Sequence, residues 1–592
     1  MATYEFYQQR AKQFQSETEQ VEKIIRQYAW SRIALMIVAV GLIYLGFSNS
    51  LFFYFAGLTV LLFFYLVKKQ LKQEEQKRVL GNLVKLNEAE ARCTQFEFSE
   101  FPNGERFADP HHPFGYDLDL FGNGSLYQYL NRSATQLGQE RLAHDLSQLG
   151  FDKETIGQRQ EAVRDLGPKV DFRQQAWAIG REINDVQFDR RPLEQWLTEQ
   201  SFIYKKKIYT IIKWLLPAIT ISLIPVVIFT SAPFSVILMM MVVQSTLAGF
   251  HFKNTARIQK ILADGRSIMA NYSKLFELLH NQKFSSPLMQ QHHSLADEAG
   301  REVKKFSALV NSLESRMNPI AMMFGNGLFL YDFHSVSNLE EWREKNAAAL
   351  PLWLKSLSEW DALLSLANLH FNHPHYASGE VTEGLVIEGK EVGHPLISAA
   401  IRVSNDLVIG NPQGIMLITG ANMAGKSTFL RTVGVNFILA QIGAPVCAAQ
   451  WKSPIITMRS GMRTSDSLQD HQSYFYAELH RLHSIMEELR SGKRMLILLD
   501  EILKGTNSTD KQLGSRELLK QLKDCNALVF LATHDIALGD LQEQFPQDIF
   551  NTCFEGKIED GQLSFDYKLH RGVAEKANAT FLMRQMGIIP DN

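Results

Sequence analysis

Four apolar runs, almost free of charge, interrupt an otherwise polar chain. Residues 33–47 and 51–67 are separated by a three-residue polar tip, and two further runs occupy 208–229 and 234–250. About 17 apolar residues are the least that a helix needs to cross the hydrocarbon core of a bilayer. Because the runs come in pairs joined by short tips, the pattern predicts two helical hairpins that insert into a membrane.

Basic residues flank both hairpins and predict their orientation. Positive charge on the outer flanks, with uncharged tips, is typical of a hairpin whose two ends are cytoplasmic. Lys213, the one charge inside an apolar run, lies near the basic end, where a lysine can extend to the headgroups. The alternative is that the runs are core helices of a soluble protein, but the repeated arrangement favours the membrane. The flanking residues are Arg26, Arg32, Lys68, Lys69 and Lys72 for the first hairpin, and Lys205, Lys206, Lys207, Lys253, Arg257 and Lys260 for the second.

The remaining pattern divides the chain into helical and mixed regions. Within 117–204 and 254–377, apolar residues recur at helical spacing, whereas from residue 378 short apolar strands alternate with helices. The second pattern is typical of an α/β nucleotide-binding domain. The predicted organisation is a helical N-terminal segment (1–28), a transmembrane hairpin (29–69), a linker (70–116), a helical block (117–204), a second hairpin (205–253), a second helical block (254–377) and an α/β domain (378–592).

Composition narrows the function only slightly. Lys+Arg 61 against Asp+Glu 63 leaves a formal charge of −2, so no global basic bias indicates nucleic acid. The four cysteines include no C-x-x-C pair, which excludes a zinc ribbon and offers no disulfide framework. The polar and charged opening of the chain does not fit a cleavable signal peptide. We therefore expect a multi-pass protein of the cytoplasmic membrane, with both termini and the α/β domain in the cytoplasm.

A glycine-rich loop carries the clearest chemical signal. Residues 420–428 fit G-x-x-x-x-G-K-[ST], and they lie between a strand-like apolar run and a helix-length apolar stretch. Backbone N–H groups of such a loop, with the positive end of the helix dipole, bind phosphate. Lys426 is expected to contact the β- and γ-phosphates and the Ser427 hydroxyl to bind Mg²⁺. The predicted ATP-binding residues are Gly420, Ala421, Asn422, Met423, Ala424, Gly425, Lys426, Ser427 and Thr428.

Two later apolar strands end in residues suited to catalysis. The run 495–499 is followed by Asp500 and Glu501, and the run 528–532 is followed closely by His534. Asp500 is expected to hold Mg²⁺ together with Ser427 or through water, and Glu501 to orient or deprotonate the attacking water. His534 suits a γ-phosphate sensor, because ligands bind at the carboxyl edge of an open α/β sheet. The alternative is a histidine that merely caps the next helix.

Taken together, these motifs resemble the MutS family of DNA mismatch-repair ATPases. The resemblance is specific over about residues 390–590, and the helical blocks are similar to the family's core and lever domain more weakly. The stretches that carry it are His394-Pro395-Leu396, Asn405-Asp406, 419–431, 441–448, 463–468, 473–478, Asp500-Glu501, 505–509 and Thr533-His534.

The resemblance implies an ABC-type P-loop ATPase that uses ATP and Mg²⁺ and works as a homodimer. In that family the counterpart of Ser473 reaches the γ-phosphate bound by the other subunit, and the counterpart of Asn422 contacts the phosphates and the catalytic water. Tyr474 stands where the family usually has threonine. DNA enters as a partner through this resemblance alone.

The departures from the family pattern define the functional hypothesis. A membrane hairpin replaces the N-terminal mismatch-recognition domain, and the second hairpin falls where the family inserts its DNA clamp. Residues 98–100 match the family's Phe-x-Glu motif, but we expect the match to be chance in so short a stretch. The sequence thus predicts a membrane-anchored, divergent MutS-like ATPase lacking the recognition domain, whose composite sites drive lever motion against DNA or against the hairpins.

Two alternatives stay open at this stage. The first is a transport ATPase with fused membrane and motor domains. Against it, four short spans make a thin transport pathway, and the chain has no L-S-G-G-Q run. The second is a structural membrane scaffold whose dimerisation is gated by ATP and which has no DNA role. Its hydrolysis of ATP would be very slow, unlike that of a motor.

Overall fold

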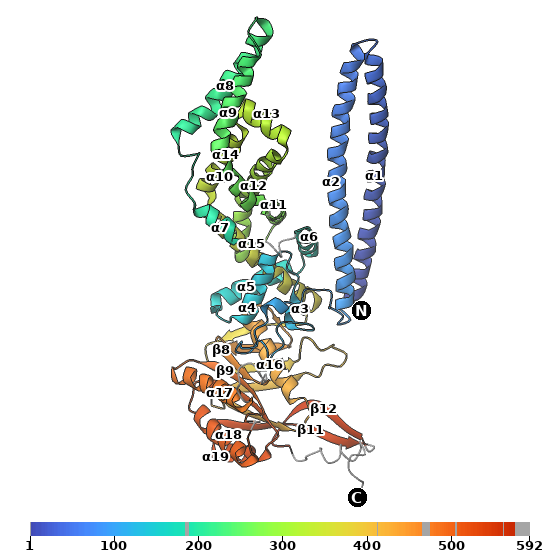
Figure 1. Cartoon of the computed structure of the whole chain (residues 1–592). Helices are drawn as coiled ribbons and strands as arrows, with labels where there is room; N and C mark the ends of the chain where they lie inside the picture. Colours follow the sequence, from blue (N-terminus) through green and yellow to red (C-terminus); the bar gives the residue numbers. More distant parts are fainter. Residues whose placement is uncertain are drawn as a thin grey trace.

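The computed structural model describes residues 2–183, 189–263, 265–410, 412–463, 474–503, 506–559 and 562–574. The described chain is part helical and part α/β, with the helical part above and the sheets below in Figure 1. Two helical hairpins project from the helical part in the same direction, and their connecting loops point away from the sheets (Figure 1).

The first hairpin consists of the two longest helices, α1 (Ala2–Gly46) and α2 (Leu51–Cys93). Its upper half exposes large apolar side chains such as Val40 and Leu61. Its lower half packs on the helical body, where the Tyr7 hydroxyl donates to Asn372 Oδ1 at 2.8 Å. The hairpin thus has an apolar, exposed end and a polar end bound to the rest of the protein.

The expected linker at 70–116 begins, instead, with the second half of α2. Leu80, Leu83 and Leu86 recur at three-residue spacing on the buried side of this helix. That spacing is typical of a helix. It was missed because most of the surrounding residues are charged or polar, which favoured a linker. Irregular structure starts only after Cys93.

The second hairpin contains α8 (Lys207–Phe229) and α9 (Ser235–Phe250). Pro217 and Pro225 both lie inside α8. Among the described residues, α1, α2 and α8 are long and apolar enough to cross a membrane. The expected fourth span reaches that length only if α9 is counted with α10 (Phe252–Ala263), from which it is bent by 62°. The structure therefore supports three candidate spans, or four with this bent pair.

The helical body lies between the hairpins and the sheets. Its largest buried side chains include Trp342, Trp353 and Trp360, and one continuous apolar core joins this body to α16 (Lys426–Gln441) of the α/β part. The other helices of the helical part are α3 (Leu126–Leu130), α4 (Gln136–Ser147), α5 (Lys153–Leu166), α6 (Val170–Gly180), α7 (Arg191–Thr198), α11 (Gly265–His280), α12 (Pro287–Glu314), α13 (Pro319–Phe329), α14 (Tyr331–Asn346) and α15 (Ala349–Asn372).

The main sheet has the strand order β12-β11-β5-β10-β9-β8. Its four inner pairings, from β11 to β8, are parallel, and β12 closes one edge antiparallel to β11. The strands are β5 (Ile415–Gly420), β8 (Thr457–Gly461), β9 (Met495–Asp500), β10 (Ala527–Thr533), β11 (Ile549–Glu559) and β12 (Gln562–Arg571).

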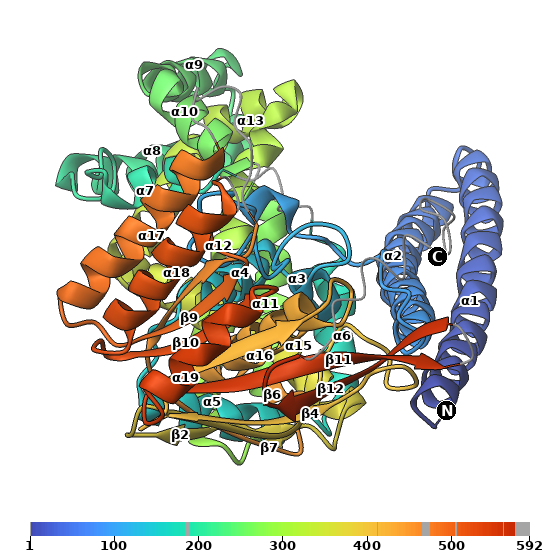
Figure 2. The same ribbon diagram turned by 90° about the horizontal axis from the view of Figure 1, so that it is seen from below.

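Alternate residues of β5, β9 and β10 face two different cores. One set packs with α16 (Lys426–Gln441) in the core shared with the helical body. The other set packs with α17 (Tyr474–Arg490), α18 (Ser508–Leu522) and α19 (Leu541–Gln544) on the opposite face, where Figure 2 shows α17 and α18 side by side. Because both faces are covered, these strands are continuous apolar runs and not alternating ones.

A second, smaller sheet borders the main one with the strand order β2-β7-β3-β4. Its strands are β2 (Glu380–Thr382), β3 (Val386–Val392), β4 (Asn405–Gly410) and β7 (Gln450–Pro454). The pair β1 (Ala377–Ser378) and β6 (Pro445–Val446) lies beside it. The chain between β3 and β4 contributes one wall of the site described next.

Candidate nucleotide site

The predicted site residues follow three neighbouring parallel strands. β10 lies between β5 and β9, with Thr533 opposite Thr419 and Ala532 opposite Asp500. The three strands therefore end at one edge, which is where ligands bind in open α/β sheets. The glycine loop, Asp500, Glu501 and His534 all come from that edge.

The loop between β5 and α16 needs its two glycines. A Cβ on Gly420, whose φ is +153°, would lie 2.7 Å from the carbonyl oxygen of Phe554. Gly425 has φ +107° immediately before α16 begins at Lys426. A side chain at either position would strain the backbone. The loop can therefore turn tightly and place the amino end of α16 toward the cavity.

Two side chains at the start of α16 take up defined positions. Lys426 is 5 % exposed, and its ammonium group donates to the carbonyl oxygens of Gly420 (2.7 Å) and Ala421 (2.9 Å). The Ser427 hydroxyl donates to Asp500 Oδ2 at 2.5 Å. Lys426 is thus held within the loop, and Ser427 is joined to the end of β9.

The donor set at this point fits Mg²⁺. A hydroxyl and a carboxylate are hard oxygen ligands, and Mg²⁺ is usually bound by one or two such groups together with phosphates and water. In the part of the chain that the structure describes, no group of three or more His, Cys, Asp or Glu side chains could hold a metal by itself. Ser427 and Asp500 would therefore bind the ion jointly with a nucleotide.

Glu501 and His534 lie together at the same edge. Glu501 has a left-handed backbone, with φ +55°, and its N–H donates to the Ala532 carbonyl at 2.9 Å. Its Oε1 is 3.3 Å from His534 Nδ1. This conformation is uncommon for a residue other than glycine and is enriched at functional sites. It directs the Glu501 side chain to the cavity that the glycine loop also lines.

The backbone that follows Glu501 is anchored by α17. Glu478, a buried residue of that helix, accepts a hydrogen bond from the Leu503 N–H at 2.5 Å. Leu503 also has a positive φ, of +59°. Glu478 ends the stretch 473–478, which together with 463–468 resembles the family's signature segment, and it supports the backbone beside the predicted catalytic residue Glu501.

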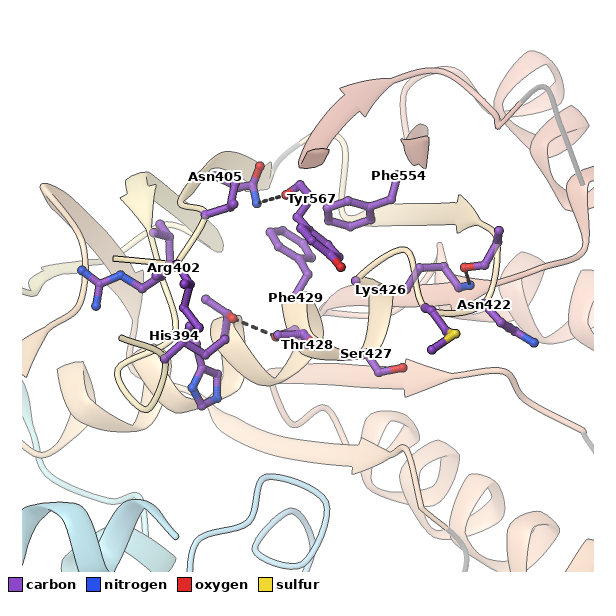
Figure 3. Close-up of a pocket in the computed structure, with 18 of the residues that line it drawn as sticks. His394, Arg402, Asn405, Asn422, Lys426, Ser427, Thr428, Phe429, Phe554 and Tyr567 are labelled. Atoms are coloured by element: carbon purple, nitrogen blue, oxygen red, sulfur yellow. Dashed lines mark hydrogen bonds between the residues drawn. The ribbon is translucent and has the colours of Figure 1, made fainter. Parts of the chain in front are cut away.

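The cavity at this edge has a volume of about 460 Å³ (Figure 3). Seven of the nine predicted loop residues line it, while Gly420 and Ala424 do not. Ala424 is 1 % exposed and supports the loop from inside. Ser473 lies outside the described residues, as do 464–472 and Gly505 of the other resembling stretches.

The opposite wall of the cavity was not predicted from the sequence. Phe429, Phe554 and Tyr567 lie between the glycine loop and the connection from β3 to β4 (Figure 3). The Phe429 and Phe554 rings are 5.7 Å apart, and the Tyr567 carbonyl accepts a hydrogen bond from Asn405 Nδ2 at 3.0 Å. The aromatic residues at 554 and 567 are far from the loop in sequence, and only the β11–β12 ribbon brings them to it.

The β3–β4 connection contributes His394 and Arg402. Burial, assisted by the nearby Arg431 and Arg402 guanidinium groups, lowers the pKa of His394 to about 4. The imidazole is therefore neutral near pH 7. Arg402 is held by the Tyr376 hydroxyl, with Nη1 3.1 Å away. This wall has one cation, Arg402, beside neutral and apolar side chains.

A loop of the helical body contacts both ends of the site. Asp119 Oδ2 lies 3.1 Å from Arg431 Nη1 on α16, and its Oδ1 lies 2.5 Å from Arg463 Nη1. Arg463 is the first residue of the predicted signature segment and the only one of 463–468 that the structure describes. Close by, Asp117 accepts hydrogen bonds from the Ser460 hydroxyl and the Met462 N–H. The helical body is thus connected to the P-loop helix and to the start of the signature segment.

The stretch 98–100, which has the letters of the Phe-x-Glu motif, is occupied by local contacts. Phe98 packs edge-on against Tyr129, with ring centroids 5.2 Å apart. The Glu100 carboxylate pairs with Arg92 at 2.5 Å. Both side chains belong to the turn after α2 and do not project as a wedge.

Comparison with known proteins supports a relationship to the MutS family over part of the chain. Residues 416–591 match MutS domain V. A protein named DNA mismatch repair protein MutS from Lysinibacillus sphaericus (strain C3-41) is 33 % identical over 235 residues, which are 38 % of this chain and 26 % of that protein. The MutS protein of Bacillus velezensis (strain DSM 23117 / BGSC 10A6 / LMG 26770 / FZB42) is 27 % identical over 356 residues, or 58 % of this chain and 36 % of that protein. The chain therefore spans about a quarter to a third of the length of these relatives.

Proposed function

We propose that this chain is a MutS-like ATPase anchored in a membrane, in which ATP binding and hydrolysis move the helical body. One observation carries the proposal: Lys426, Ser427 and Glu501 line a single cavity at the carboxyl edge of a parallel sheet, where Asp500 contacts Ser427 and His534 contacts Glu501. The partial similarity to MutS proteins, which includes domain V, supports the same reading.

Each group has a defined part in hydrolysis. Loop N–H groups and Lys426 bind the phosphates. Ser427 and Asp500 would hold Mg²⁺, which would supply positive charge to offset the negative charge on the transferred group. Glu501 orients the attacking water and accepts its proton. His534, 3.3 Å from Glu501, holds that carboxylate in place and responds to the γ-phosphate. Phe554 and Tyr567 provide an apolar, aromatic surface suited to a nucleotide base.

The active form is a homodimer under this proposal. The family resemblance places Ser473 of one copy against the γ-phosphate bound by the other. When the dimer closes, Asp119 would transmit the change to the helical body. Its carboxylate contacts both Arg431 on α16 and Arg463, the first residue of the signature segment.

The exposed apolar helices support the membrane part of the proposal. Exposed side chains such as Leu61 on α2 and Ile228 on α8 would be costly in water over so large a surface, and a bilayer removes that cost. Both hairpins point away from the sheets (Figure 1), and their basic flanks support a cytoplasmic position for the nucleotide site.

The first experiment measures ATP binding and steady-state hydrolysis by the full chain in lipid nanodiscs. Lys426→Ala is expected to abolish ATP binding, and Glu501→Gln to retain binding while lowering turnover by at least about 100-fold, the usual contribution of a general base. Lys452→Ala, which changes an exposed lysine on β7, is the matched control. Undiminished hydrolysis by Glu501→Gln would refute the catalytic assignment.

A second experiment decides what the motion acts on. A gel-shift titration with homoduplex and mismatched duplex DNA, at several salt concentrations, tests DNA binding. Salt-dependent binding, tighter for the mismatched duplex, supports a mismatch-repair role near the membrane. No shift at low salt would remove DNA from the proposal and leave an ATP-driven membrane device.

A further inference from the structure

The helix α13 is apolar although it lies outside both predicted hairpins. It runs from Pro319 to Phe329, and no charged residue occurs between 317 and 331. Ile320, Met323 and Phe324 are 68 %, 55 % and 47 % exposed. Spacings of three and four residues place these side chains on one side of the helix. A soluble body would gain nothing from such a surface unless something covered it.

The position of α13 indicates what covers it. It packs against α8 and α9 beside the second hairpin (Figure 1). The approach to α9 is close, because a Cβ on Gly327 would lie 3.0 Å from Met241 Cε. Met241 belongs to the apolar run of α9, so α13 lies at the depth of that run. Its exposed side is therefore continuous with the apolar surface of the second hairpin.

The length of α13 shows that it does not cross the bilayer. Eleven residues extend about 16 Å, roughly half of the ~30 Å hydrocarbon core. The chain returns at Leu330, which has a left-handed backbone with φ +47°, and continues into α14. Asn326 supports this return, since its Oδ1 accepts the Asp332 N–H at 2.8 Å.

A buried ion pair closes the base of this excursion. Arg316 Nη2, before α13, lies 3.0 Å from Asp332 Oδ2, after it, and both side chains are 4 % exposed. The Arg316 guanidinium also lies over the Phe252 ring at 5.0 Å, at the point where α9 bends into α10. The two charges are thus paired where the apolar surface ends, and only uncharged residues lie beyond them.

We propose that α13 is a membrane-dipping helix, whose Ile320–Phe324 side contacts lipid acyl chains beside α8 and α9. The inference rests on the proposed insertion of the second hairpin. Acyl chains are the occupant favoured by the continuity with the apolar surface of that hairpin. A protein interface would instead be expected to carry a polar rim around its apolar centre.

This contact gives the helical body its own attachment to the bilayer. α13 connects α12 to α14, and α12 packs against α11, α14 and α15 of the body. A movement of α12 and α14 driven by nucleotide would therefore change the depth of α13 directly, in addition to any effect on the hairpins.

Spin labels report the depth of α13 in the full chain. A Cys525→Ser background removes the one partly exposed thiol, because Cys93, Cys447 and Cys553 are buried. Single cysteines at Ile320 and Phe324 probe α13, Leu238 of α9 is the lipid reference, and Leu352 of α15 is the water reference, being 62 % exposed. The protein is reconstituted in phosphatidylcholine–phosphatidylglycerol vesicles, and collision rates with oxygen and with a water-soluble nickel chelate are measured.

The expected result is a several-fold higher oxygen-to-nickel collision ratio at 320 and 324 than at 352, close to the ratio at 238. Ile320→Cys changes the most exposed of the three side chains, so it remains informative if Phe324→Cys disturbs folding. A water-like ratio at 320 and 324 beside a lipid-like ratio at 238 would overturn this inference and leave the hairpin anchor standing. A water-like ratio at 238 as well would overturn the proposed membrane insertion, and α13 with it.

Discussion

The inner strands of the main sheet and the two hairpins contain the same kinds of apolar residue, but the strands bury these side chains and the hairpins expose them. Leu498 of β9 and Leu531 of β10 are 0 % exposed, whereas Leu61 of α2 and Ile228 of α8 are 69 % and 68 % exposed. β9 and β10 are six and seven residues long, and each is hydrogen-bonded to two neighbouring strands. The hairpin helices satisfy their backbone groups internally.

The difference lies in the backbone and not in the side chains. A short strand cannot satisfy its own N–H and C=O groups, so it must lie inside a sheet that both core layers cover. A helix has no such need and can present its whole surface to lipid. The same apolar composition therefore produces a buried core in one region and an exposed, membrane-compatible surface in the other.

The largest expected effect tests this contrast directly. Leu498→Ala should cost about 2–5 kcal/mol of folding free energy, because it empties a site packed beside Gly434 and Leu118. Leu61→Ala should change stability by less than about 0.5 kcal/mol in detergent, since its side chain is 69 % exposed. Thermal unfolding of both variants, followed at the nucleotide site, measures the difference. Equal destabilisation would mean that the hairpin is packed as tightly as the sheet.

The next effect tests the junction between the first hairpin and the body. Glu90, near the end of α2, accepts from Arg132 Nε at 2.6 Å and from Asn368 Nδ2 at 3.0 Å, and both Glu90 and Arg132 are buried. Glu90→Gln should destabilise the protein by about 3–5 kcal/mol, because the buried Arg132 would keep its charge without a carboxylate to compensate it. The same melting experiment applies.

The matched control for that junction lies higher on the same hairpin. Glu22 pairs with Lys77 at 2.8 Å between α1 and α2, and both side chains are more than 40 % exposed. Glu22→Gln should leave the melting temperature unchanged, because solvent already screens the pair. If the two variants behaved alike, burial would not be what distinguishes the junction from the projecting arm.

The stability of the parts outside the hairpins should also depend on pH, because three of their histidines have lowered pKa values. Burial lowers the pKa of His292, His373 and His394 to about 4. Unfolded histidines titrate near 6.5, so between about pH 4 and 6.5 the unfolded state binds more protons than the folded state. Stability should therefore rise with pH across this window and level off above it, by up to about 3 kcal/mol for each histidine.

Melting curves in detergent from pH 4.5 to 8 measure this dependence. His292→Asn should reduce the slope below pH 6.5, because one fewer group gains a proton on unfolding. An unchanged slope would show that His292 is protonated in the folded protein as well.

The smallest expected effect concerns communication between the regions. Asp119→Asn weakens the contacts to Arg431 and Arg463, and the carboxylate is 41 % exposed, so the change should be modest. We expect kcat for ATP to fall several-fold with KM within about threefold, since Asp119 does not line the cavity. Asp171→Asn, an exposed carboxylate on α6, serves as the control. A rise in KM without a fall in kcat would show that Asp119 acts on nucleotide binding alone.

Much of the nucleotide site was predictable because its signals are local. The glycine spacing at 420–428, the apolar run that ends in Asp500 and the strand that precedes His534 each need only a few neighbouring residues. The structure has a strand, a loop and a helix at the first of these positions, and it brings Ser427 to 2.5 Å from Asp500. The hairpin tips at 47–50 and 230–234 were predictable for the same reason.

Other parts of the site depend on distant segments. Phe554 and Tyr567 reach the cavity only because β11 pairs with β5 and β12 returns along β11. Asp119 reaches Arg431 because a loop of the helical body packs on the sheet edge. The apolar character of 319–329 is visible in the sequence, but its place beside α9 is not. Ser473, predicted to act across a dimer, lies outside the described residues and stays a prediction.

By itself, the sequence determined the elements whose physics is local: where the uncharged apolar runs and their tips lie, where the glycine-rich turn lies, and which strand ends in carboxylates. Only the tertiary structure decided what those elements meet, namely the aromatic wall of the cavity, the Asp119 contacts and the apolar surface shared by α13 and the second hairpin. The physical reason is that backbone conformation depends on nearby residues, whereas contacts between distant segments depend on how whole surfaces pack.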